Sequence, residues 1–135
     1  MKKLMTGMLA CTLITLASCK KDDDDLPTPA GIAGTYNLYE VEVYNPPSTH
    51  ALPSDDGEHG KIIVTVSSDS TAKVQLLLYT NDKVEADTTI DCKIGKDQDG
   101  DIFVTGAADG SNVAYFFDNE MDFYAIPNYR LGGRK

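Results

Sequence analysis

The chain has 135 residues, with 12 Lys and Arg against 21 Asp and Glu, a net charge of −9, and 41% hydrophobic residues. This length accommodates one domain, and the hydrophobic content is too high for a chain that is disordered throughout. The negative charge argues against a nucleic-acid-binding surface, which needs clustered Lys and Arg, and against a basic patch that docks on anionic lipid.

Residues 1–18 have the layout of a secretory signal peptide. Lys2 and Lys3 give a positive start, and residues 4–17 carry no charge. As a helix these 14 residues reach about 21 Å, short of the ~30 Å hydrocarbon core of a bilayer. The segment therefore predicts a cleaved leader and not a stable membrane span.

The leader ends in Leu16-Ala17-Ser18-Cys19, which resembles the lipobox of bacterial lipoproteins. The resemblance implies that Cys19 is lipidated and becomes the new N-terminus, so that a lipid anchor holds the protein at a membrane. The alternative is an ordinary signal peptide that contains a cysteine. Removal of the leader leaves 10 basic and 21 acidic residues, and Cys92 then has no intramolecular disulfide partner.

Residues 19–30 predict a solvated tether, because four adjacent carboxylates repel one another and two prolines stiffen the far end. A lysine followed by an acidic run also resembles the export signal of some lipoproteins in two-membraned bacteria. That resemblance implies a position on the outer face of the outer membrane. The alternative is a plain spacer, with the domain facing the periplasm. The signal residues are Lys21, Asp22, Asp23, Asp24 and Asp25.

Residues 31–135 predict one all-β domain, because apolar and polar residues alternate and turn residues recur about every ten positions. Eight antiparallel strands in sequential hairpins close into an up-and-down barrel, which removes exposed edges. A β-sandwich fits the same alternation and is the alternative. The expected strands are residues 34–44, 61–67, 71–80, 83–94, 101–105, 112–117, 120–126 and 129–135.

The first strand opens with Gly34-Thr35-Tyr36, which resembles the Gly-X-Trp start of lipocalins and other calycins, with Tyr in place of Trp. The resemblance implies that the ring plugs the barrel floor and packs against an Arg from the end of the last strand. If the last strand pairs antiparallel with the first, Arg134 lies at that end, and Arg130 lies ~13 Å higher. We therefore expect Arg134 to stack on Tyr36.

Two acidic segments invite a metal hypothesis. The loop 45–60 holds His50 and His59 among carboxylates, but without regular ligand spacing, so we expect a mobile loop that lies as a lid over the barrel mouth.

Residues 97–101 resemble the start of an EF-hand calcium loop. Gly100 is at the fourth position, however, where the loop needs its Gly at the sixth, and Ala108 is at the twelfth, where it needs a Glu. We expect a hairpin turn there, and no metal or other cofactor.

No pattern predicts an enzyme. Cys92 alternates in phase with Val84, Ile90 and Ile94, so we expect a small buried side chain and not a nucleophile. The chain contains neither a Gly-X-Ser-X-Gly turn nor a phosphate-binding loop.

Aromatic residues in the last third supply the functional hypotheses. On alternation, Tyr115, Phe117 and Phe123 face inward, where they either line a pocket or fill the barrel. The first hypothesis is a lipid-anchored, lipocalin-like protein that binds a small apolar molecule. The alternative is a non-enzymatic interaction module with a filled interior, acting through the outward aromatics Tyr39, Phe116 and Tyr124. Neither hypothesis names a protein partner.

Overall fold

The computed structural model describes residues 28–135. The predicted leader, the lipidation site Cys19 and the predicted export signal lie outside the described residues. No helix within residues 28–135 is long and apolar enough to span a membrane. The elements are η2 (Ala30–Ile32), β1 (Gly34–Tyr44), β2 (Pro47–Ala51), β3 (Glu58–Ser68), β4 (Thr71–Thr80), β5 (Lys83–Lys96), β6 (Ile102–Gly106), β7 (Asn112–Phe117), β8 (Glu120–Phe123) and β9 (Tyr129–Arg134).

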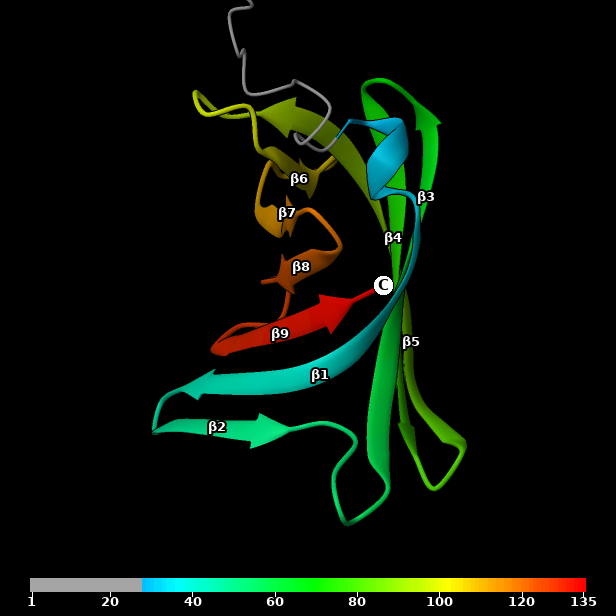
Figure 1. Ribbon diagram of the computed structural model, residues 1–135, viewed down its shortest axis with the longest axis vertical. Helices are drawn as coiled ribbons and strands as arrows, with labels where there is room; N and C mark the ends of the chain where they lie inside the picture. The colour runs from blue at the N-terminus through cyan, green and yellow to red at the C-terminus, as the bar shows by residue number, and fades with distance from the viewer. Residues whose placement is uncertain (1–27) are drawn as a thin grey trace, which may run out of the picture.

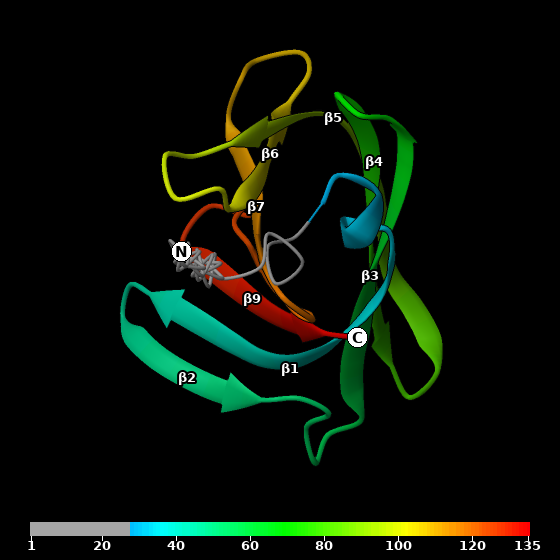
Figure 2. The same cartoon turned by 45° about the horizontal axis from the view of Figure 1, so that its top comes forward.

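Eight of the strands form a closed antiparallel barrel. Strands β1 and β3 to β9 follow one another around the sheet in chain order, and β9 pairs back onto β1. Figure 2 shows this ring of strands, with η2 near β3. The closing register runs from Asn37 opposite Arg134 to Val43 opposite Tyr129. The predicted up-and-down barrel is confirmed, the sandwich is excluded, and the architecture is consistent with a calycin-like fold.

The remaining strand, β2, lies within the predicted loop 45–60. It pairs with β1 over residues 40–44, whereas β3 pairs with β1 only over residues 34–37. Strand β1 thus changes its neighbour halfway along its length, and Figure 1 shows β2 alongside β1 while β3 and β4 run apart from it. Part of the predicted loop is therefore a strand that is held in the sheet through β1.

The floor half of the barrel is filled by apolar side chains. All the inward-facing residues there are nearly inaccessible to solvent, and Tyr36, Phe116 and Phe123 are the largest of them. The core consists of Ile32, Tyr36, Leu38, Ile62, Val64, Val74, Leu76, Cys92, Ile102, Val104, Val113, Ala114, Phe116, Met121, Phe123 and Leu131. This core and the barrel pairings are formed by residues from η2 to β9.

Tyr36 is fully buried at the barrel floor. Its ring packs on Phe116, with centroids 5.8 Å apart, and its hydroxyl donates a hydrogen bond of 2.8 Å to the carbonyl of Ile32 in η2. Burial raises the pKa of the Tyr36 hydroxyl. At the start of the strand, Gly34 has a φ of 144°, a conformation that residues with a Cβ rarely adopt.

The expected stacking of Arg134 on Tyr36 is wrong. The Arg134 guanidinium lies 4.7 Å from the ring centroid of Tyr39, and the cation over Tyr36 is Lys135, whose Nζ is 5.1 Å from the centroid. The closing register explains the difference, because it places Arg134 opposite Asn37, on the outer face. Side chains alternate between faces with a period of two, so an offset of one residue exchanges inside for outside.

Two adjacent glycines let β9 close against β1. A Cβ on Gly133 would lie 3.0 Å from the Cβ of Tyr36, inside the barrel. A Cβ on Gly132 would lie 3.0 Å from the ring of Tyr39, on the outer surface. The Gly-Gly pair therefore accommodates one tyrosine on each face of the sheet.

Arg130 joins three strands across the same seam. Its Nε donates to Glu42 at 2.7 Å, its Nη1 to Asp122 at 2.6 Å, and its Nη2 to Glu40 at 2.5 Å. The hydrogen bond to Glu42 is the main cause that raises the pKa of Arg130, and those to Asp122 and Glu40 act in the same direction. The guanidinium thus links β1, β8 and β9 on the outer face.

Truncation of the floor tyrosine should destabilise the barrel. We expect Tyr36→Ala to lower the free energy of unfolding by about 3–5 kcal/mol because it leaves a cavity, and Tyr36→Phe to lower it by about 1 kcal/mol through loss of the hydroxyl bond. Urea unfolding followed by circular dichroism measures both. Tyr44→Ala, at a half-exposed site on the same strand, is the control and should change the stability by only about 0.5 kcal/mol. Equal losses for Tyr36→Ala and Tyr44→Ala would contradict the role of Tyr36.

Candidate functional site

A pocket of about 320 Å³ opens at the barrel mouth. It lies where β1 has left β3, between the β1 and β9 wall and the far ends of β3, β4 and β5. It lies at the end of the barrel where β4 turns into β5, and Figure 1 shows η2 at the other end of these strands. The lining residues are Val41, Leu52, Glu58, His59, Leu78, Tyr79, Thr80, Glu85, Ile126, Tyr129 and Leu131.

The pocket walls are largely apolar because of two local features of the strands. A β-bulge at Tyr39 shifts the phase of β1, so that Val41 pairs with the buried Leu131. On the facing wall, Gly60 has no side chain, and a Cβ there would lie 2.8 Å from Leu38 and 2.9 Å from Leu78. The missing Cβ lets these two leucines converge below the pocket.

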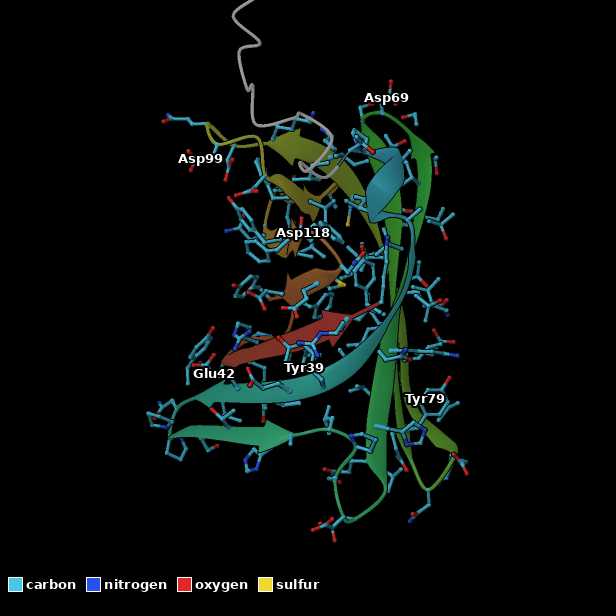
Figure 3. The ribbon with its side chains drawn as sticks, in the orientation of Figure 1. Tyr39, Glu42, Asp69, Tyr79, Asp99 and Asp118 are labelled. Atoms are coloured by element: carbon cyan, nitrogen blue, oxygen red, sulfur yellow. The ribbon has the colours of Figure 1, made fainter. Side chains whose placement is uncertain are left out.

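The rim of the pocket carries aromatic and polar groups. The His59 ring stacks on Tyr79, with centroids 4.9 Å apart and planes 5° from parallel. In Figure 3, Tyr79 lies on the side of β4 away from β1. The Nζ of Lys61 lies 5.9 Å from the centroid of the Tyr79 ring. Tyr129 completes the rim from β9 and is 39% exposed.

The aromatic residues predicted to line a pocket are elsewhere. Phe123 faces inward but is packed in the core, whereas Tyr115 faces outward and Phe117 is 44% exposed. The inward residue of β7 is Phe116, which pairs with the buried Ile102 and Met121. Both faces of β7 are apolar in sequence, so alternation alone did not determine which face is inside.

The outward aromatics do not form the surface expected for an interaction module. Phe116 is in the core, and Tyr39 is covered by Arg134. The rings that do stack on the outer face are those of Phe103, Tyr115 and Phe117, with centroids 5.5 and 6.2 Å apart. The basis given for the interaction module is therefore removed.

The two histidines of the predicted loop lie on different strands. His50 lies on β2 and hydrogen-bonds Ser48, while His59 lies on β3. Within residues 28–135, no three His, Cys, Asp or Glu side chains are grouped so as to hold a metal ion. The expected turn at residues 97–101 is confirmed, because Asp97 Oδ1 accepts hydrogen bonds of 2.9 Å from the backbone N–H groups of Asp99 and Asp101.

A more open depression of about 620 Å³ lies at the same end, between β5 and the loop from β6 to β7. Asp109 in its wall accepts hydrogen bonds from the backbone N–H of Ser111 at 3.0 Å and from its hydroxyl at 2.7 Å. These bonds lower the pKa of Asp109. Because this carboxylate is engaged within its own loop, we place the candidate site at the narrower, mainly apolar pocket.

Sequence reasoning missed the residues that line the pocket. The bulge at Tyr39 brings Val41 inward, and a second bulge at Glu85 leaves Val84 51% exposed although alternation placed it inside. One signal was available, because an isolated glycine within an apolar strand, here Gly60, marks a close approach of side chains or a bulge.

Cys92 is 2% exposed, which confirms the expected buried side chain. Burial, with a smaller effect of the Asp91 charge, raises the pKa of its thiol to about 11. The folded chain thus keeps a proton that the unfolded chain loses at about pH 8.5. Because the pKa of the Cys92 thiol is higher in the folded chain, its contribution to the stability is fully present below about pH 8.5. That contribution is lost as the pH rises toward 11.

Alkaline pH should therefore destabilise the wild-type protein more than Cys92→Ala. Between about pH 8 and about pH 10.5, we expect wild type to lose roughly 2 kcal/mol of stability relative to the variant, through the thiol proton. Urea unfolding at the two pH values measures the difference, and a thiol reagent should label Cys92 only when the chain unfolds. A constant gap between the two proteins would contradict the prediction.

Comparisons of the chain with protein-family models, with curated proteins and with solved structures found no match in any of the three. The site is therefore described by its own geometry. It is a small apolar pocket at the open end of a closed eight-stranded barrel whose floor half is filled.

Proposed function

We propose that the protein is a lipid-anchored envelope protein that binds a small, mainly apolar molecule at the mouth of a lipocalin-like barrel, without catalysis. The apolar pocket beside Val41, Leu78 and Leu131 is the observation that carries this proposal. Its volume of about 320 Å³ is at the lower end of the range of roughly 300–1,000 Å³ for small-molecule sites. The ligand is accordingly small, because the core closes the barrel below it.

The anchor in this proposal is supported by the sequence. The lipobox-like segment ending at Cys19 supplies the acylation site, and the acidic run from Asp22 to Asp25 favours the outer face of the outer membrane. A single chain-terminal anchor keeps a folded domain at a bilayer without inserting it. The negative charge of the chain fits this arrangement, because the domain itself then needs no affinity for anionic lipid.

Binding in the pocket is tested with Nile red, a neutral solvatochromic dye, and with mass spectrometry of an organic extract of the purified protein. We expect dye fluorescence to rise on binding, and Val41→Phe, which fills the pocket, to weaken dye binding about tenfold or more. Val43→Phe is the matched control, because Val43 is on the same strand but does not line the pocket. An unchanged dye affinity in Val41→Phe, or no binding by wild type, would rule out this pocket as the site.

The anchor is tested by following the protein in cells of a two-membraned bacterium. We expect Cys19→Ala to abolish incorporation of labelled fatty acid, because the acyl acceptor is lost. Replacement of Asp22, Asp23, Asp24 and Asp25 by Ala should retain acylation but remove accessibility to protease added to intact cells. Unchanged protease accessibility in that variant would contradict the export signal and leave a spacer in its place.

A further inference from the structure

The charged side chains that line the pocket are acidic, whereas a fatty acid would need basic ones to bind its carboxylate. Two carboxylates, Glu58 and Glu85, are among the lining residues, and the lining contains neither Lys nor Arg. Both side chains are exposed, so they face the water at the mouth and the apolar residues lie below them.

Strand register brings the two carboxylates to the same edge of the pocket. Glu58 on β3 lies opposite Thr80 on β4, and Thr80 lies opposite Lys83 on β5, two residues before Glu85. Neighbouring strands are about 4.8 Å apart, so Glu58 lies on one side of β4 beside Thr80, and Glu85 lies on the other side, beside Leu78 and Tyr79. Glu85 is the bulge residue of β5, which sets it apart from the regular alternation of that strand.

Neither carboxylate is neutralised by a cation. Among the residues that the structure describes, neither Glu58 nor Glu85 forms an ion pair, and the contact of Glu58 is a 3.4 Å hydrogen bond from the Ser54 hydroxyl. The Nζ of Lys61 lies over the ring of Tyr79, and neither Lys61 nor Lys83 lines the pocket. The mouth therefore carries two carboxylates that form no ion pair, together with the His59 imidazole, which lies 3.6 Å from Asp82, above an apolar cavity.

We propose that the ligand of this pocket is a small amphiphilic amine, whose ammonium group is attracted to the mouth by Glu58 and Glu85 and whose apolar body contacts Val41, Leu78 and Leu131. This inference rests on the proposed binding function and names its ligand class. Charge complementarity favours the cation and repels a carboxylate of the same chain length. The exposed ring of Tyr129 at the rim offers the ammonium a cation–π contact in addition.

The test compares three probes that share one alkyl chain and differ in head group: octylamine, octanol and octanoate. Competition with Nile red on the purified protein gives the three affinities, after circular dichroism has shown that each variant is folded. We expect octylamine to bind about tenfold more tightly than octanol, and octanoate to bind more weakly than octanol. The double variant Glu58→Gln and Glu85→Gln should bind octylamine and octanol equally, with the affinity for octanol unchanged.

The matched control is the double variant Asp55→Asn and Asp56→Asn, which removes two carboxylates from the same end of the barrel but outside the pocket. It should keep the preference for octylamine, so loss of the preference there would assign it to the general field of the protein and overturn the proposal. Binding of octanol without any preference for octylamine would also overturn it while leaving the proposed function intact. No binding of any probe or of Nile red would mean that the proposed function itself fails.

Discussion

The pairing of β1 with β9 is the contact on which the rest of the structure depends. It turns a meander of hairpins into a closed wall, and without it both edge strands would expose unpaired backbone groups. Gly132 and Gly133 leave room for the side chains of Tyr39 and Tyr36, so β9 can approach β1. Arg130 on β9 hydrogen-bonds to a carboxylate on each neighbouring strand, β1 and β8. Small side chains and one guanidinium therefore achieve closure in a domain without a disulfide among its described residues.

Much of the fold was predictable because alternation is strong in hairpins with one buried face. Strands β4 and β7 have the predicted bounds, and the closure of the last strand on the first was also predicted. Strand β2 was not predicted, because its five residues are all exposed and include no apolar alternation. Its conformation is set by hydrogen bonding to β1, which is a tertiary contact that local sequence does not encode.

The candidate site was less predictable than the fold. Its walls depend on the β-bulge at Tyr39, and each bulge reverses the inward phase for the rest of its strand, so the error propagates from one residue to many. Aromatic content pointed to Tyr115 and Phe117 instead, although a strand that is apolar on both faces gives no indication of which face is buried. An error of one residue in the phase of the last strand also explains why Arg134 was expected over Tyr36, where Lys135 lies instead.

The position of η2 shows which end of the barrel the proposed anchor would precede. The chain enters the folded unit at Thr28, whose carbonyl caps η2 beside the sealed floor, while the pocket opens at the other end. Acylation upstream of this entry point would put the length of the barrel between the bilayer surface and the opening.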